Sequence, residues 1–390
     1  MRITHYLHHL WSNEGGVYRA VLDLCREQAR AGLDVTLASC DPRDVPAAWR
    51  SGGPGLPRVH PLPALGAGRA LFDPRAVGAF ASMVGGLDVL HLHNVWDPMH
   101  VPMSREARAA GKPYVLSAHG MLADWSLAQK RWKKMVSMRV FARRVLSHAA
   151  GMHLTAQGEL DQSAKRHPGT PGYVVPLMLD LEPYREAPDA AAARRELELP
   201  PPGEPTILYL SRLHDKKRPD LVIRSVADLR RKGTKAWAIM AGPGEDPYRA
   251  WLQRVAVDSG AGEYVRFLGM VPEPLKPSLF AACDLFVLPT HMENFGFVYF
   301  ESLACGTPLV TTRGTDTWKE LESSGAAVIV NNPATVEELS GAIARLLSDR
   351  EALRARGRAG RDWVLSNMAP ERIVGGYVRM YESVVRGGRP

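Results

Sequence analysis

The sequence has few cysteines and no long apolar run. Its 390 residues include four cysteines, which lie far apart and lack the close spacing of zinc ligands or of a disulfide framework. No apolar stretch approaches the roughly 20 residues that a membrane-spanning helix needs, and a strand-like segment begins directly after Met1. We therefore expect reduced cysteines that serve packing, in a soluble and cytoplasmic protein.

Motifs of several function classes are also missing. The chain has no complete dinucleotide-binding fingerprint, no recognisable nucleic-acid-binding module, and no acidic pair near its histidines with the spacing of a divalent-cation site. These absences predict that the protein needs neither a metal ion nor a cofactor and does not bind nucleic acid. Because the net charge is +8, nucleic-acid binding stays a rival hypothesis, which filter binding across a salt series would test.

The length and the alternating pattern of the chain predict two α/β domains. Both halves alternate short apolar runs with amphipathic helical stretches, which is typical of βαβ units and a parallel sheet. Strands are expected near residues 2–7, 33–39, 88–93, 113–118, 151–155, 173–176, 206–211, 236–241, 264–268, 284–289, 308–312 and 326–330. Helices are expected near residues 16–31, 98–110, 126–148, 156–166, 219–232, 247–259, 273–282, 297–305, 335–348, 350–366 and 370–386.

Prolines separate the two halves. The regular pattern lapses between Pro176 and Pro205, which predicts a linker with a short helix near residues 190–197. A second proline- and glycine-rich stretch, residues 51–68, is predicted to be a surface loop. The expected parts of the chain are a first domain, a linker, a second domain and a final helix, over residues 1–180, 181–204, 205–368 and 369–390.

Two glutamates eight residues apart, Glu293 and Glu301, carry the strongest functional signal. Between them lies Gly296, at the expected turn from a buried strand into a helix. In an open parallel sheet, ligands bind outside the carboxyl ends of the strands, and the first amides of a following helix attract anions. Because carboxylates accept hydrogen bonds from vicinal hydroxyls, the motif predicts a sugar-phosphate ligand. The alternative is a solvated helix with two surface acids.

The loop after the strand near residues 206–211 gathers positive charge, in the sequence Arg212-Leu-His-Asp-Lys-Lys-Arg218. Arg212 can clamp phosphate oxygens through two hydrogen bonds, and Lys217 supplies a compact point charge. Together they could neutralise a diphosphate leaving group. A solvated basic loop is the alternative, and the presence of the glutamate motif in the same half favours ligand binding.

Two weaker motifs lie at strand ends in the first half. Gly15 and Gly16 open a helix after the first strand, where paired glycines let the backbone approach a ligand closely; an ordinary tight turn would give the same pattern. His119 follows the strand near residues 113–118, where a neutral imidazole could donate to a sugar hydroxyl or ease developing charge. His91 and His93 are expected as its neighbours rather than as a metal site.

Residues 126–148 form a basic segment that contains no acid. Its basic residues are Lys130, Arg131, Lys133, Lys134, Arg139, Arg143 and Arg144. The apolar residues expected on another side of the same helix are Trp132, Met135, Val136 and Leu146. This pattern is typical of an interfacial helix attracted to anionic lipid, although a helix with a solvated basic face would share it. Residues 1–180 hold 21 Lys/Arg against 14 Asp/Glu, and this excess favours membrane contact.

Taken together, these residues resemble glycosyltransferase family 4, the retaining enzymes of GT-B fold that transfer sugars from nucleotide-sugar donors. The resemblance covers nearly the whole chain and is most specific in residues 293–310, then in residues 211–217. Gly15-Gly16 and His119-Gly120 match more weakly but in the right order. The resemblance implies two Rossmann-like domains whose parallel sheets face across a cleft, with a C-terminal helix that crosses back to the first domain.

The resemblance also implies a role for each motif. Arg212 and Lys217 would hold the donor diphosphate, Glu301 would bind the ribose hydroxyls, and His119 would lie near the C6 hydroxyl of the sugar. The residues expected to contact the donor are Gly15, Gly16, Arg212, Lys217, Gly269, Met270, Glu293, Phe295, Gly296, Phe297 and Glu301, with Gly269 and Met270 at the base. The residues expected to take part in catalysis are His119, Glu293, Arg212 and Lys217.

The implied reaction moves a hexose from a UDP- or GDP-linked donor to a saccharide, with negative charge growing on the departing diphosphate. A polyprenyl-diphosphate-linked acceptor at the inner face of the cytoplasmic membrane is expected. Two departures from the family pattern stand out: Arg218 replaces a common glycine, and residues 315–318 replace a glycine-rich turn, as in a subgroup that makes exopolysaccharide or lipopolysaccharide. The rival hypotheses are a sugar-nucleotide epimerase or phosphorylase of the same architecture, and a lectin-like protein.

Overall fold

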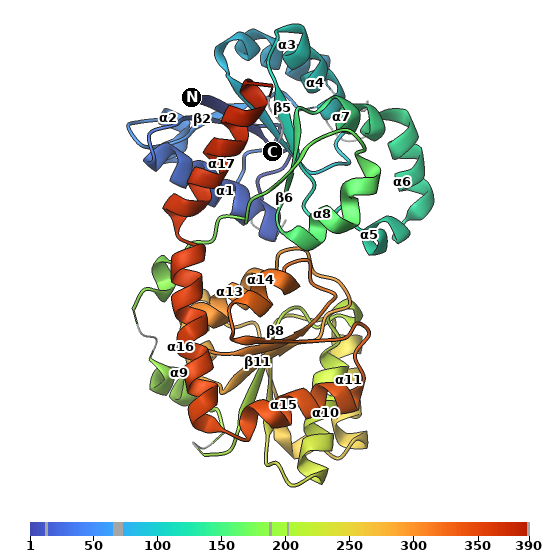
Figure 1. Cartoon of the computed structure of the whole chain (residues 1–390), viewed down its shortest axis with the longest axis vertical. Helices are drawn as coiled ribbons and strands as arrows, with labels where there is room; N and C mark the ends of the chain where they lie inside the picture. The colour runs from blue at the N-terminus through green and yellow to red at the C-terminus, as the bar shows by residue number, and fades with distance from the viewer. Residues whose placement is uncertain (12–14, 65–72, 187–188, 201–202, 388–390) are drawn as a thin grey trace. The chain divides into compact units, whose positions relative to one another are not determined.

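The structure is a computed structural model that describes residues 1–11, 15–64, 73–186, 189–200 and 203–387 (Figure 1). The chain divides into two compact units. The first unit comprises Met1–Leu179 together with Pro370–Pro390, and the second comprises Asp180–Ala369. The segment predicted as a linker, residues 181–204, is therefore counted with the second unit. In the part of the chain that the structure describes, no helix combines the length and the apolarity needed to cross a membrane.

The first unit is built on a seven-stranded parallel sheet in the order β3-β2-β1-β4-β5-β6-β7. Its strands are β1 (Arg2–Tyr6), β2 (Asp34–Ser39), β3 (Arg58–Pro61), β4 (Val89–His93), β5 (Tyr114–Ser117), β6 (Gly151–Leu154) and β7 (Gly172–Val174). Its helices are α1 (Gly16–Arg30), α2 (Ala48–Ser51), α3 (Pro74–Met83), α4 (His100–Ala109), α5 (Asp124–Ala128), α6 (Arg131–Ser137), α7 (Arg143–His148), α8 (Gln157–Ser163) and α17 (Pro370–Val385). The C-terminal helix α17 packs beside α1 in this unit, as the sequence predicts (Figure 1).

Three expectations for the first unit were wrong. Residues 51–68 were predicted to be a loop, but β3 lies within them and pairs in parallel with β2. Helix α3 was not predicted, although Asp73 caps it by accepting from the amide of Arg75. The single helix expected over residues 126–148 is divided into α5, α6, a π-helical turn at Met138–Ala142 and α7. Its first break is at Lys130, which has the left-handed φ of 49°.

The second unit repeats the doubly wound arrangement with six parallel strands in the order β10-β9-β8-β11-β12-β13. Its strands are β8 (Thr206–Leu210), β9 (Trp237–Ala241), β10 (Val265–Gly269), β11 (Leu285–Leu288), β12 (Leu309–Thr312) and β13 (Ala327–Val330). Its helices are α9 (Ala190–Glu196), α10 (Pro219–Arg231), α11 (Asp246–Asp258), α12 (Lys276–Ala282), α13 (Phe297–Ala304), α14 (Trp318–Ser323), α15 (Val336–Leu347) and α16 (Arg350–Asn367). Helix α14 was not predicted.

The strand order of the second unit determines where a ligand can bind. The order reverses between β8 and β11, so the connections after these two strands leave in opposite directions and expose the strand ends. Both strands are buried along their whole length, which explains their continuous apolar sequences. The loops that follow β8 and β11 therefore meet at the switch point of the sheet.

Gly242 holds neighbouring strand ends close together at the same edge. It has a φ of 126°, and a Cβ atom there would lie 2.0 Å from the carbonyl oxygen of Ser211. Its amide donates to the carbonyl of Gly269 (2.7 Å). The carboxyl ends of β8, β9 and β10 thus meet at a residue that has no room for a side chain.

We expect Gly242→Ala to destabilise the second unit by about 1–3 kcal/mol, because the added methyl group clashes with backbone that cannot move freely. Gly233→Ala is the matched control: Gly233 also has a positive φ, of 92°, but nothing lies within 4 Å of a Cβ atom there. The measurement is the urea midpoint of each variant. Equal midpoints for the two variants would show that the close approach at Ser211 is unimportant.

Candidate active site

A partly buried ion pair lies at the switch point of the second sheet. Lys217 ends a short helical turn, Asp215–Lys217, after β8, and its side chain is buried. Its ammonium group pairs with a carboxylate oxygen of Glu293, on the loop after β11. The two residues predicted separately from the cationic loop and the glutamate motif are therefore direct partners.

Further charges surround this pair. Burial, followed by the nearby charge of Lys217, lowers the pKa of Lys216 to about 8. Arg212 lowers the pKa of Lys216 as well, while Glu293 raises it, which places these side chains within electrostatic range of one another. Arg212 itself is exposed, and its carbonyl accepts from the hydroxyl of Tyr209 (2.8 Å). The site thus combines a buried ammonium group with a guanidinium group that is open to solvent.

The loop after β12 fixes the backbone of the loop that carries Glu293. The amide of Glu293 donates to the carbonyl of Gly314 (2.9 Å), and the amide of Asp316 donates to the carbonyl of Glu293 (2.9 Å). The hydroxyl of Thr317 donates to the carbonyl of Phe295 (3.0 Å). In the sequence, residues 315–318 stand out only as a departure from the family pattern. The structure shows that the backbone of Gly314 and Asp316 and the side chain of Thr317 support the loop that carries Glu293.

Gly296 forms the turn from this loop into α13. Its φ of 70° is left-handed, and a Cβ atom there would lie 2.4 Å from the ring of Tyr299 and 3.0 Å from Cγ of Glu293. Among the described residues, no side chain caps the start of α13, so its first amides can serve an anion. Phe295 is buried and stacks on Phe300 (4.7 Å between ring centroids), while Phe297 meets Phe295 edge to face (5.2 Å). These aromatic contacts hold the turn in place.

Glu301 is buried inside the second unit. It is 1% exposed, and its carboxylate lies 3.4 Å from the ammonium group of Lys276. Lys276, at the start of α12, also pairs with Glu273 (3.0 Å). Lys276 was not singled out from the sequence, because a lone lysine at a helix start carries no motif. The contact of Glu301 with ribose hydroxyls stays a prediction.

The arginine that replaces the family's glycine has a structural explanation. Arg218 adopts a left-handed φ of 53° directly before α10, a conformation that glycine adopts at no steric cost. Its guanidinium group lies against Asp220 (3.2 Å) and the ring of His291 (3.4 Å). Its side chain is thus engaged within the unit rather than added to the cations of Arg212 and Lys217.

The remaining predicted donor contacts are divided between the two units. Gly269 has a φ of 68°, and the following Met270 is 71% exposed, so its side chain is open to a ligand. In the first unit, Gly15 precedes α1 with a φ of 79°, and Gly16 begins that helix. Glu14, which the sequence places before them, lies outside the described residues. The roles of these four residues stay predictions.

His119 follows β5 in the first unit, on a tightly held loop. It has a φ of 48° and is 8% exposed. Burial lowers its pKa to about 3, so the imidazole is neutral. The next amide, that of Gly120, donates to the buried carboxylate of Glu159 (2.5 Å), which also accepts from the amide of Thr155 (2.7 Å). Glu159 therefore fixes the backbone that carries His119.

Comparisons with known proteins identify the family of the chain. The family described as "Glycosyl transferases group 1" matches residues 192–363, and the "Glycosyl transferase 4-like domain" matches residues 15–177. The chain is 27% identical to the GDP-mannose-dependent alpha-(1-6)-phosphatidylinositol monomannoside mannosyltransferase of Mycolicibacterium smegmatis, over 76% of this chain and 77% of that protein. It is 29% identical to D-inositol 3-phosphate glycosyltransferase 1 of Catenulispora acidiphila, over 96% and 92% of the two chains.

The chain belongs to glycosyltransferase family 4. The fold supports the assignment: the crystal structure of Anabaena HepE in complex with UDP superposes with a TM-score of 0.79 at 18% identity, covering 98% of this chain and 100% of that one. The predicted GT-B class and the prediction of a glycosyltransferase are therefore confirmed. As a family 4 member, the chain uses a nucleotide-sugar donor.

We expect Lys217→Met to lower kcat by about 10²–10³, because it removes a buried cation from the place where the donor diphosphate is predicted to bind. Lys235→Met, which changes an exposed lysine of the same unit, should keep the wild-type rate. Transfer assays measure kcat for each variant, and circular dichroism checks that each variant is folded.

A double variant separates catalysis from folding. Lys217→Met leaves Glu293 without its partner, which can disturb the site by itself, whereas Lys217→Met with Glu293→Gln removes both charges. We expect the double variant to stay inactive. If it recovered the wild-type rate, the ion pair would have only a structural role.

Proposed function

We propose that the protein is a retaining hexosyltransferase that moves a hexose from a UDP- or GDP-linked donor to a lipid-linked saccharide in the synthesis of a bacterial surface polysaccharide. The observation that carries the proposal is the pair between the buried Lys217 and the partly buried Glu293. The start of α13, which no side chain of the described residues caps, lies at the same edge of the sheet. A cation and the start of a helix at one strand edge suit a diphosphate, and a neighbouring carboxylate suits sugar hydroxyls.

In the proposed mechanism, the anomeric C–O bond loosens while negative charge grows on the departing diphosphate. Lys217 and Arg212 stabilise that charge, together with the amides at the start of α13. The acceptor hydroxyl attacks from the face that the diphosphate leaves, and the departing phosphate takes its proton. Glu293 keeps Lys217 in place and accepts from hydroxyls of the donor sugar. No metal ion or cofactor takes part in these steps.

Acceptor-dependent release of nucleotide diphosphate tests this function. GDP-mannose is the first donor to try, since the mycobacterial relative is named for it, and UDP-glucose is the second. With a polyprenyl-diphosphate-linked saccharide as acceptor, we expect release of GDP or UDP and a product that keeps the donor's anomeric configuration by NMR. Isomerised sugar nucleotide in the absence of acceptor would instead identify an epimerase, and a sugar covalently trapped on a side chain would contradict the mechanism.

An exposed apolar face on the basic segment supports membrane contact at the inner face of the cytoplasmic membrane. Trp132, Met135, Val136 and Val140 are 68%, 54%, 53% and 66% exposed. Leu146, which the sequence placed with this face, is instead 1% exposed and packs in the core of the first unit. The basic residues Arg131, Lys133, Arg139 and Arg143 are exposed around the same helices. Apolar side chains between exposed cations match an anionic lipid surface.

We expect Trp132→Ser with Val140→Ser to weaken binding to anionic vesicles by at least about tenfold, because each exposed side chain loses its transfer into the lipid interface. Trp251→Ser is the matched control, since Trp251 is an exposed tryptophan of the second unit (37%). Flotation with phosphatidylglycerol-containing vesicles makes the measurement. If the double variant bound as strongly as the wild type, residues 126–148 would not be the anchor.

A further inference from the structure

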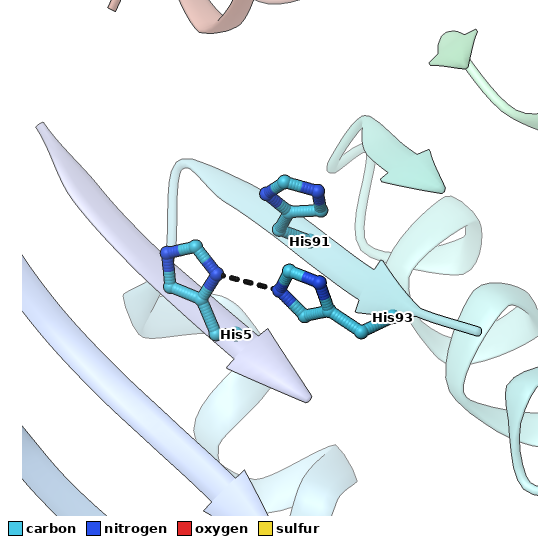
Figure 2. A group of neighbouring side chains, drawn as sticks. All are labelled: His5, His91 and His93. Atoms are coloured by element: carbon cyan, nitrogen blue, oxygen red, sulfur yellow. Dashed lines mark hydrogen bonds between the residues drawn. The ribbon is translucent and has the colours of Figure 1, made fainter. Parts of the chain in front are cut away.

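Five buried histidines of the first unit are joined by hydrogen bonds into one chain. His5 lies on β1, His91 and His93 on β4, His153 on β6, and His119 follows β5. Figure 2 shows the first three, with the hydrogen bond between His5 and His93. Three further side chains connect the histidines: Gln28 on α1, Ser117 on β5 and Tyr381 on α17.

These rings do not form a metal site. Nitrogen atoms of His5, His91 and His93 lie within 4.8 Å of one another. However, the rings of His91 and His93 stack face to face, with centroids 4.3 Å apart and planes 23° apart. Imidazole lone pairs lie in the plane of the ring, so stacked rings cannot direct them to one ion. Every nitrogen of the three rings also has a hydrogen-bond partner already.

The direction of every hydrogen bond in this histidine network follows from the bond at one of its ends, the carbonyl of Val175. The carbonyl of Val175 can only accept, so Nε2 of His153 donates to it (2.8 Å). Burial lowers the pKa of His153 to about 4, so the ring is neutral and its Nδ1 must accept from the hydroxyl of Ser117 (2.6 Å). Ser117 has then used its one proton and accepts from Nε2 of His91 (2.7 Å).

The same reasoning continues through the C-terminal helix. Burial also holds the pKa of His91 well below its usual value, so its Nδ1 accepts from the hydroxyl of Tyr381 (2.7 Å). The oxygen of Tyr381 in turn accepts from the side-chain amide nitrogen of Gln28 (3.2 Å). The carbonyl oxygen of Gln28 therefore faces His5 and accepts from its Nε2 (2.8 Å).

The series of hydrogen-bonded side chains ends at His119. Burial lowers the pKa of His5 to about 4 and holds that of His93 well below its usual value, so both rings are neutral. Nδ1 of His5 accepts from Nε2 of His93 (3.0 Å), and Nδ1 of His93 accepts from Nε2 of His119 (3.1 Å). Nδ1 of His119 is left with a bare lone pair. This atom is buried and has no hydrogen-bond partner among the described residues.

We propose that the chain from Val175 fixes His119 as the Nε2–H tautomer, so that its Nδ1 accepts a hydrogen bond from a hydroxyl group of a bound sugar. The tautomer is independent of the proposed function, whereas the identity of the ligand as a sugar rests on it. A buried acceptor without a partner is unfavourable, and a ligand hydroxyl satisfies it. The sequence predicts that His119 donates to a sugar hydroxyl; in this proposal His119 accepts from the hydroxyl instead. His93, His5 and Gln28 act as positioning residues.

Two-bond ¹⁵N–¹H NMR on the full-length protein with ¹⁵N-labelled histidine reports each tautomer directly. We expect all five histidines to be neutral and protonated on Nε2 between pH 6 and 8. His119→Gln assigns the terminal signal, and His148→Gln, which removes an exposed histidine, should leave the five signals unchanged. A proton on Nδ1 of His119, or a doubly protonated ring in the chain, would overturn the proposal.

Substitutions at Gln28 test whether the chain sets this tautomer. Gln28→Glu keeps an acceptor for His5, so His119 should stay protonated on Nε2. Gln28→Lys offers only donors, so the polarity of His5, His93 and His119 should reverse and place the proton of His119 on Nδ1. An unchanged tautomer in a folded Gln28→Lys variant would contradict the proposal, and the wild-type spectrum tests it even if that variant does not fold.

The rate of transfer tests the role of the bare nitrogen. With GDP-mannose as donor, kcat/KM should fall about tenfold in Gln28→Lys and stay near the wild-type value in Gln28→Glu, because only the former loses the acceptor. Equal rates in a Gln28→Lys variant whose tautomer has reversed would overturn the proposed contact with the sugar. If the wild type showed no transfer at all, the proposed function would fail while the spectra still decided the tautomer.

Discussion

The ion pair between Lys217 and Glu293 is the interaction on which the candidate active site depends. Removing two charged groups from water is costly, and their attraction compensates only when the geometry is fixed. The structure supplies that geometry: Gly296 lets the glutamate loop turn into α13, and Asp316 and Thr317 hold its backbone. A diphosphate that reaches Lys217 would bring negative charge to a cation whose desolvation has already taken place on folding. Pre-organisation of this kind favours charge developing in the transition state over the ground state.

The hydrogen-bonded histidines of the first unit form a network of a different kind. A polar network in a protein core is stable only when its members satisfy one another. The side chains of this network do so in a single direction, with the exception of Nδ1 of His119 at its end. The chain joins β1, β4, β5 and β6 to α1 and to α17. The helix that returns from the end of the sequence therefore contributes Tyr381 to the interior of the first unit as well as an apolar face.

Local patterns were sufficient to predict most of the fold. Fully buried parallel strands give continuous apolar runs such as Leu285–Leu288, and these were located to within one or two residues. Elements without such a pattern were missed: β3 is a short edge strand whose residues are partly exposed or exposed, and α14 has only six residues. The sequence predicts one helix for the basic segment because basic and apolar residues alternate along it. Its division near Lys130 depends on the backbone conformation of that residue, which the pattern of residue types does not indicate.

The site was predictable where motifs lie at strand ends, as for Lys217 and Glu293. The contacts that support it come from elsewhere in the sequence. Lys276 belongs to no motif, and Asp316 lies in a segment that the sequence marks only as a departure from the family pattern. The hydrogen-bonded histidines come from both ends of the polypeptide, and only the fold brings them together. The tautomer proposed for His119 has the same origin, since a tautomer is set by partners that the sequence around His119 does not contain.

A crystal structure of the protein with bound GDP tests the central claim most directly. The account predicts diphosphate oxygens within hydrogen-bonding distance of the ammonium group of Lys217 and of the first amides of α13. A nucleotide bound at another edge of the second sheet, with Lys217 still paired to Glu293 alone, would contradict it.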